Sequence, residues 1–261
     1  MKKTLPIIGG SLTALALAQL YVLGAKGGIG PLGFIRRNQI AGHPGNGEEY
    51  SFKKLAPRPD SPLRGKKICV LGSSVVFGAA SNEMAVAEYL AHRFDCAYTK
   101  EAVSGTTLCD IGPDSYVSRL KKLDKAEKYD LFLCQLSTND ATRKLPLGEP
   151  GSENTKTVTG AITAIVRYIR RVWGCPVVFF TGSRYDSKPY AAMVRRLLEL
   201  QGSLGFGVID LWNADSFNSI SKEQRKLFMA DGIHPTRAGY RDWWGPEMEK
   251  QLLILLSNKK L

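Results

Sequence analysis

The sequence predicts an α/β fold, a three-layer α/β/α sandwich around a central, mostly parallel sheet of five strands. Two observations indicate this. Short apolar runs such as Ile68-Cys69-Val70-Leu71, which ends at Gly72, alternate with longer segments of helical periodicity. Runs that are apolar on both faces are typical of buried parallel strands. Regular alternation of strands and helices predicts helices on both faces of the sheet.

The predicted elements follow one another from residue 66 to residue 256. Apolar runs rich in β-branched and aromatic residues predict strands, and apolar positions spaced three and four apart predict helices. Strands are expected at 68–71, 98–103, 131–134, 176–181 and 208–211, and helices at 83–94, 155–173, 189–204 and 236–256. In such folds ligands bind beyond the carboxyl ends of the strands, so chemistry should be sought just after each strand.

Composition and charge exclude several classes of protein. A chain of 261 residues suits one substantial domain plus an extra segment. Its net charge of +12 favours anionic partners, although solvated helix faces account for such charge equally well. The sequence contains no nucleic-acid-binding signature, so nucleic acid is not an expected partner. The five cysteines form no C-x-x-C pair, which favours neither disulfides nor a metal site.

Residues 1–25 are a candidate membrane anchor or signal segment. Lys2 and Lys3 precede an uncharged stretch over residues 5–25, and about 20 apolar residues of helix span a bilayer. The two lysines favour a cytoplasmic N-terminus with the domain outside the cytoplasm. Ala16-Leu17-Ala18 also fits a signal-peptide cleavage site, which would give a secreted protein. A buried helix is the third interpretation.

Residues 26–64 are rich in glycine, proline and charge. Such composition is typical of a tether, and we expect this one to pack on the domain partly at most. The folded domain is then expected over residues 65–261.

Polar or glycine residues follow three of the predicted strands. Ser74 lies in a glycine-flanked turn after the first strand, where a helix N-terminus can receive an oxyanion. Gly105 follows the second strand and allows close approach of a backbone N–H. Asn139 follows the third strand and can donate its amide to an oxyanion. A plain turn, a turn glycine and a helix cap are the alternatives for the three positions.

His234 stands out among the three histidines because a carboxylate, Asp231, precedes it by three residues. An aspartate in that place can orient the imidazole, as in acyl-transfer triads. His43 lies in the predicted tether and His92 in a predicted amphipathic helix. A structural loop histidine is the alternative for His234.

Together these segments resemble the sequence blocks of the SGNH (GDSL-like) hydrolase family. The resemblance covers residues 66–256, and its most distinctive pieces are GSSVVFG from Gly72 and DGIHPTRAGY from Asp231. It implies a flavodoxin-like fold and an esterase that needs neither cofactor nor metal. Ser73 and Ser137 depart from the family pattern, at the positions of an aspartate and a glycine.

The resemblance also implies roles for individual residues. Ser74 would be the nucleophile, His234 the general base and Asp231 its orienting partner. The backbone N–H groups of Ser74 and Gly105 and the Asn139 side chain would form the oxyanion hole. Ser73 is the alternative nucleophile, and Ser74 is favoured because the residue directly before Val75 aligns with the family nucleophile.

The sequence leaves the substrate open between two esters. The first is a small acyl group on carbohydrate or an envelope polymer, for which Trp173 and Trp212 would be sugar-stacking residues if they were exposed. The second is a lipid, in a membrane-directed esterase or lysophospholipase. An acyltransferase or a non-catalytic member of the same fold is a further alternative. The sequence also leaves open the oligomeric state and the role of residues 143–154.

Overall fold

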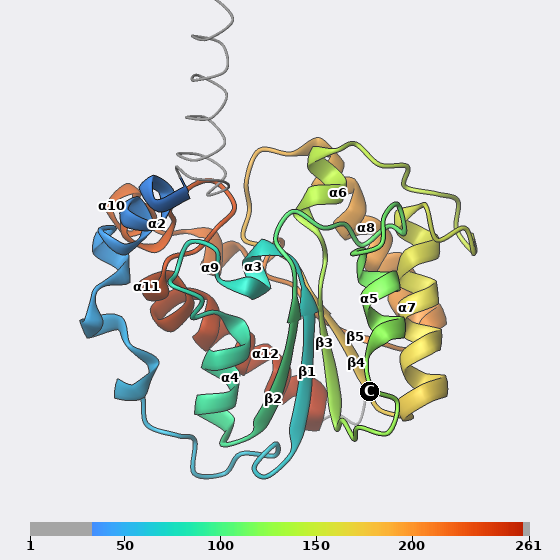
Figure 1. Cartoon of the computed structure of the whole chain (residues 1–261), viewed down its shortest axis with the longest axis horizontal. Coiled ribbons are helices and arrows are strands. Elements are labelled where there is room, and N and C mark those ends of the chain that lie inside the picture. The colour runs from blue at the N-terminus through green and yellow to red at the C-terminus, as the bar shows by residue number, and fades with distance from the viewer. Residues whose placement is uncertain (1–32, 258–261) are drawn as a thin grey trace, which may run out of the picture.

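The computed structural model describes residues 33–257 and contains one five-stranded sheet (Figure 1). The strand order is β2-β1-β3-β4-β5, and every neighbouring pair is parallel. This confirms the predicted α/β fold. The strands are β1 (Lys67–Gly72), β2 (Ala97–Ala102), β3 (Leu131–Gln135), β4 (Val177–Phe180) and β5 (Gly207–Ile209).

Helices cover both faces of the sheet (Figure 1). One face carries α5 (Tyr116–Lys122), α7 (Val158–Trp173) and α8 (Lys188–Leu204), and the other α4 (Val86–Phe94) and α12 (Gly245–Ser257). The remaining α-helices are α2 (Gly33–Ala41), α3 (Ser74–Phe77), α6 (Thr138–Thr142), α9 (Asp215–Asn218), α10 (Lys222–Phe228) and α11 (Arg237–Gly239). Single turns are η1 (Pro44–Asn46), η2 (Glu48–Tyr50), η3 (Phe52–Lys54) and the π-helical η4 (Tyr240–Trp244).

Strand β1 shows why its sequence belongs in the middle of the sheet. Cys69 and Leu71 lie in the core beneath α5, α7 and α8, whereas Ile68 and Val70 lie in the core beneath α4 and α12. Successive side chains of a strand point to opposite faces. A strand that is apolar on both faces, as residues 68–71 are, therefore needs a helical layer on each side, and this chain supplies both.

Strands β2 and β3 lie on opposite sides of β1, so the direction in which successive strands follow one another across the sheet reverses there. Helices leaving β1 and β3 thus diverge, and a crevice opens between them at the carboxyl edge of the sheet. This is where open α/β folds bind their ligands. The turns after β1 and β3 contain Ser74 and Asn139 respectively.

Three helix predictions differ from the structure. The single helix expected at 236–256 is divided into α11, the π-helical η4 and α12. The helix expected at 83–94 begins only at Val86, because Asn82 and Glu83 adopt positive φ angles of 52° and 61°. Helix α5 was not predicted, because it is only 7 residues long and contains three basic residues. Ser115 starts it by accepting a hydrogen bond from the Ser118 backbone N–H at 3.0 Å.

Part of the predicted tether is packed into the domain. Phe52 and Leu63 are 1% and 4% exposed and belong to the core beneath α4 and α12. Asn46 donates its amide to the Ala80 carbonyl at 2.9 Å and accepts from the Arg237 backbone N–H at 2.8 Å. These contacts fasten the segment to the turns after α3 and before α11. The domain boundary at residue 64 stays a prediction.

Within residues 33–257, none of the helices combines the length and the apolar character needed to cross a bilayer. The segment predicted as an anchor or signal, residues 1–25, lies outside the described residues.

We predict that Asn46→Ala lowers the free energy of unfolding by about 2–4 kcal/mol, because it leaves the Ala80 carbonyl and the Arg237 N–H buried without partners. Urea unfolding of both proteins would measure this. Asn38→Ala, which alters an exposed side chain of α2, should change stability by less than about 0.5 kcal/mol. Equal stability of the two variants would contradict the role given to Asn46.

Candidate active site

Ser74 lies where β1 ends and α3 begins, at the carboxyl edge of the sheet. A side chain at Gly72 is excluded, since a Cβ there would lie 2.2 Å from Val76 Cγ2 and 2.8 Å from Gln135 Oε1. Gly78 closes the short helix with a φ of 82° and lies against the backbone of Glu83. The glycines on either side of Ser74 are therefore required by close packing and by backbone conformation.

His234 approaches Ser74 from the far end of the chain, 160 residues away. Its Nε2 is 2.8 Å from Ser74 Oγ, and its Nδ1 is 2.9 Å from Asp231 Oδ2. Since Nδ1 faces a carboxylate, it carries the proton, and Nε2 is left to accept the serine hydroxyl proton. The structure thus brings the three predicted residues into one hydrogen-bonded relay.

The charge on Asp231 is stabilised by its own turn. Its Oδ1 accepts the backbone N–H groups of Ile233 and His234, both at 2.8 Å. Partial burial alone would raise the pKa of this carboxyl. The hydrogen bond and charge of His234 and the two backbone N–H groups outweigh burial and lower the pKa of Asp231 to about 2. The residue is therefore ionised at any pH at which the protein would work.

The turn that carries His234 is fixed to α10. Met229 and Pro235 form an antiparallel bridge, and the Ala230 N–H donates to the His234 carbonyl at 3.0 Å. Thr236 Oγ1 donates to the Leu227 carbonyl at 2.8 Å. The backbone is therefore fixed on both sides of His234, which restricts the position of the imidazole ring.

Ser73 and Ser74 have different surroundings. Ser73 is completely buried, and its backbone N–H and Oγ face Gln135 Oε1 at 2.9 and 3.4 Å. Only Ser74 Oγ lies against His234. The geometry therefore favours Ser74 over its neighbour as the reactive serine.

The three groups expected to bind an oxyanion line one cavity with the relay. Ser74, Gly105, Asn139 and His234 all line this cavity of about 840 Å³, which we call the active-site cavity. As the first residue of α3, Ser74 has a backbone N–H with no acceptor within its helix. Gly105 has a φ of 80°, and a Cβ there would meet nothing within 4 Å, so the positive φ rather than close packing favours glycine.

Side chains from α6 and its C-terminal end hold the loop that contains Gly105. The Asn139 amide donates to the Thr106 carbonyl and Arg143 donates to the Gly105 carbonyl, each at 2.8 Å. Fully buried Asp140 accepts the backbone N–H groups of Leu108 and Cys109 at 2.8 and 2.9 Å. Residues of α6 thus fix the backbone that presents the Gly105 N–H.

Arg119 of α5 is a positioning residue that the sequence reasoning missed. Only 4% exposed, it donates to the Gly72 carbonyl at 2.7 Å, to Glu101 at 2.8 Å and to Thr106 Oγ1 at 3.3 Å. It therefore ties the turn before Ser74 to the loop after β2. No sequence signal pointed to it, because an arginine beside two lysines is typical of a solvated helix face.

Helix α2 was also missed, and it forms one wall of the active-site cavity. Arg36, Arg37, Asn38, Ile40 and Ala41 line the cavity. Arg36 Nη2 lies 3.7 Å from Asp231 Oδ2, so the helix reaches the relay itself. Of the loop 143–154, Arg143 contacts Gly105, but no residue of this loop is among those that line the cavity.

The two tryptophans considered for sugar stacking do not serve that purpose. Trp212 is only 9% exposed and packs against Tyr185 and Tyr190. Trp173 packs against Phe132 and Tyr129. Both side chains belong to the core around α7 and α8, and neither lines the active-site cavity.

Metal ligation and a reactive thiol each make requirements of the side chains in the described part of the chain. No group of three or more His, Cys, Asp or Glu side chains within residues 33–257 is placed to hold a metal ion. Burial raises the pKa of the Cys96 and Cys175 thiols to about 11. Burial likewise raises the pKa of Cys69, Cys109 and Cys134. Thiols in this state are poor nucleophiles at neutral pH.

The parallel sheet and the contacts of Ser74, His234 and Asp231 at its carboxyl edge are an arrangement that hydrolases of several folds share. The model of the GDSL-like Lipase/Acylhydrolase family matches residues 70–241. Because this match spans well over half of the chain, the protein belongs to that family. No curated protein matches the chain.

Solved structures with the same fold include three of bacterial origin. A protein from Lactobacillus plantarum is 18% identical with a TM-score of 0.63, over 75% of this chain and 98% of that one. A protein from Desulfitobacterium hafniense assigned to the G-D-S-L family of lipolytic proteins is 16% identical with a TM-score of 0.56, over 71% and 99% of the two chains. A family two carbohydrate esterase from Clostridium thermocellum, solved with cellohexaose, is 17% identical with a TM-score of 0.54, over 79% and 67%. At these identities the likeness shows the fold.

We predict that Arg119→Lys lowers kcat about 10- to 100-fold on any ester that the protein hydrolyses. A lysine cannot donate to the ends of β1 and β2 together, and a shift of about 1 Å in a reacting group can cost this much. Steady-state kinetics would show it as a loss in kcat rather than a rise in KM. Arg167→Lys, on the exposed surface of α7, is the matched control. An unchanged kcat in Arg119→Lys would show that the buried guanidinium does not position the site.

Proposed function

We propose that the protein is a serine esterase that hydrolyses its substrate through an acyl-enzyme on Ser74. The observation that carries this proposal is the continuous relay from Ser74 Oγ through His234 to Asp231, with contacts of 2.8 and 2.9 Å. Membership of the GDSL-like family supports hydrolysis of esters in general. The serine mechanism is our inference from the contacts.

The proposed reaction has two proton-coupled steps. His234 Nε2 takes the proton of Ser74 Oγ as that oxygen bonds to the ester carbonyl carbon, and the protonated imidazole then gives the proton to the departing alcohol. The oxyanion that forms between these events accepts hydrogen bonds from the Ser74 and Gly105 N–H groups and from the Asn139 amide. Water, deprotonated by His234, then releases the acyl group as a carboxylic acid.

Asn139 needs no large movement to take part. One of its two amide protons is donated to the Thr106 carbonyl, and that bond fixes the plane of the amide. A primary amide has a second proton, which this contact leaves available. The side chain is therefore preorganised as an oxyanion donor, and preorganised donors contribute about 3–4 kcal/mol to such reactions.

We predict that Ser74→Ala and His234→Ala each abolish labelling by a fluorophosphonate and hydrolysis of a short activated ester. The first variant lacks the nucleophile, and the second lacks the base that activates it. Ser73→Ala and His92→Ala are matched controls outside the relay and should keep both signals. Labelling that persists in Ser74→Ala, or that fails in the unmodified protein, would refute the proposal. The second result would instead favour a non-catalytic member of the fold.

For the substrate we propose a small acyl group on carbohydrate or on an envelope polymer. The wide active-site cavity, about 840 Å³, has room for a bulky alcohol part beside a small acyl group. A lipid-directed esterase is the second candidate, and one observation favours it. Phe77, Ala79, Ile40 and Ala41 give the cavity apolar walls. An acyltransferase would use the same relay with an alcohol in place of water.

We further propose that residues 5–25 anchor the protein in a membrane with the catalytic domain outside the cytoplasm. The uncharged stretch and the preceding Lys2 and Lys3 support this. The intact mass of the mature protein tests it, and we expect the mass of the full 261-residue chain. A mass that lacks residues 1–18 would instead indicate a cleaved signal peptide and a secreted enzyme.

A further inference from the structure

Helix α2 brings basic side chains to the mouth of the active-site cavity. The helix lies at the same end of the molecule as α3, the helix that begins with Ser74 (Figure 1). Arg36 and Arg37 line the cavity together with Ser74 and His234. A substrate that places its ester bond at Ser74 therefore occupies a cavity that Arg36 and Arg37 also line.

The two arginines differ in how far the protein neutralises them. Arg36 is 27% exposed and faces Asp231 at 3.7 Å, a distance longer than a hydrogen bond. For Arg37, which is exposed, no ion pair occurs with any residue in 33–257. Glu83 is the one carboxylate among the described lining residues. The described lining thus carries more positive than negative charge, and no hydrogen bond from either guanidinium to a residue in 33–257 occupies its donors.

The chemistry of arginine narrows the kind of ligand. A guanidinium presents a planar fork of donors that matches the oxygens of phosphate and carboxylate groups. A phosphate offers several oxygens around one centre, so two forks can bind it at the same time. The apolar side chains of Phe77 and Ile40 in the same lining would contact the uncharged body of the alcohol.

We propose that the substrate is a phosphate-bearing ester, in which Arg36 and Arg37 bind a phosphate group on the alcohol part. This inference rests on the proposed esterase function, because it places the ester bond at Ser74. Two kinds of molecule could supply this phosphate group, a phospholipid through its headgroup and a phosphate-bearing carbohydrate. The two sources differ in their acyl groups, which are long in the lipid and short in an acetylated sugar.

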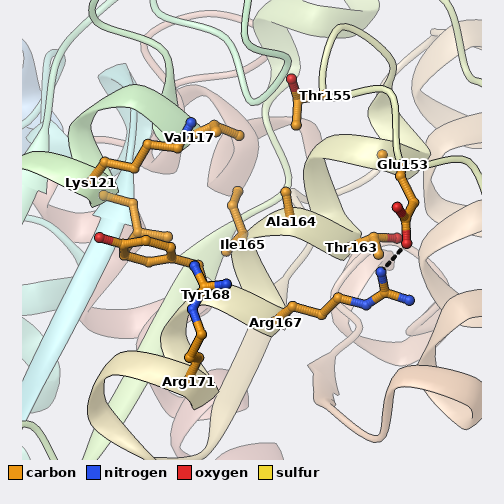
Figure 2. A pocket seen from close by; sticks show the side chains of 12 residues that line it. Val117, Lys121, Glu153, Thr155, Thr163, Ala164, Ile165, Arg167, Tyr168 and Arg171 are labelled. Carbon is orange, nitrogen blue, oxygen red and sulfur yellow. Dashed lines mark hydrogen bonds and ion pairs between the residues drawn. The ribbon is translucent and has the colours of Figure 1, made fainter.

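A second basic hollow supplies a control for general electrostatic attraction. It lies between α5 and α7, has a volume of about 260 Å³ and includes Lys121, Arg167 and Arg171 (Figure 2). Arg171 stacks on Tyr168 with its guanidinium 5.3 Å from the ring centre. Neither Ser74 nor His234 lines this hollow. Removing a positive charge there changes the net charge by the same amount without changing the active-site cavity.

The experiment compares matched pairs of esters that differ only in a phosphate, using the full-length protein in neutral detergent. The lipid pair is octanoylglycerol and octanoylglycerol phosphate, and the sugar pair is acetylated glucose and acetylated glucose 6-phosphate. We expect kcat/KM to be about tenfold higher for the phosphate member of one pair, since a charge-assisted hydrogen bond is worth about that factor. The pair that shows the preference identifies the source. Added salt should reduce the preference, as screening requires.

Variants then assign the preference to α2. Arg37→Gln should reduce the phosphate preference to about twofold, and Arg37→Lys should retain an intermediate preference. Arg36→Gln should reduce it as well. Arg171→Gln should leave both the preference and the activity unchanged. If the α2 variants unfold, glycerol 3-phosphate replaces them as a probe, because it should inhibit the unmodified enzyme on the neutral ester far better than glycerol does.

Two results would overturn the inference. One is equal kcat/KM for the members of both pairs, and the other is a preference that survives Arg36→Gln combined with Arg37→Gln. In either case Ser74-dependent hydrolysis would persist, and the proposed function would stand. Absence of Ser74-dependent hydrolysis for every ester would instead refute the proposed function itself.

Discussion

The hydrogen bond between Ser74 Oγ and His234 Nε2 is the contact on which the rest of the site depends. It joins a turn near the start of the domain to a turn near its end, and it forms because β1 lies in the middle of the sheet while the last helix packs back against it. Asp231 sits in the same short turn as His234 and moves with it. The carboxylate therefore keeps its place beside the imidazole wherever that turn is anchored.

Most residues that support this contact bind or pack against backbone atoms and do not touch the reacting side chains. Gly72 lets the turn after β1 pack closely, Arg119 ties that turn to the loop after β2, and Asp140 of α6 fixes the same loop. Backbone N–H groups are the main oxyanion donors that we propose, and their direction is set by the path of the chain. Buried polar side chains that bind main-chain atoms are thus the means by which this fold keeps its donors aligned.

The sequence was sufficient to predict the five strands, the longer helices and the residues that meet in the active-site cavity. Strands β1, β3, β4 and β5 are mainly apolar and buried, whereas the edge strand β2 contains Thr99, Lys100 and Glu101. Ser74, Gly105, Asn139 and His234 follow or precede regular elements, so periodicity together with the family resemblance located them. It was not sufficient for Arg119 or for α2, whose partners lie far away in the chain. A buried arginine cannot be told from an exposed one by its neighbours in sequence, and Phe52 likewise shows its place in the core only once the chain has folded.

The position of α2 connects the proposed membrane anchor with the proposed choice of substrate. Seven residues separate Ala25 from Gly33, and a segment of that length spans at most about 25 Å. If residues 5–25 cross a bilayer, Gly33 at the start of α2 stays within that distance of its surface. Anionic headgroups concentrate near such a surface and attract basic side chains. Arg36 and Arg37 would then have two roles that depend on the same positive charge. They would orient the domain toward the membrane, and they would select a charged ester. One short helix would thereby couple location to specificity.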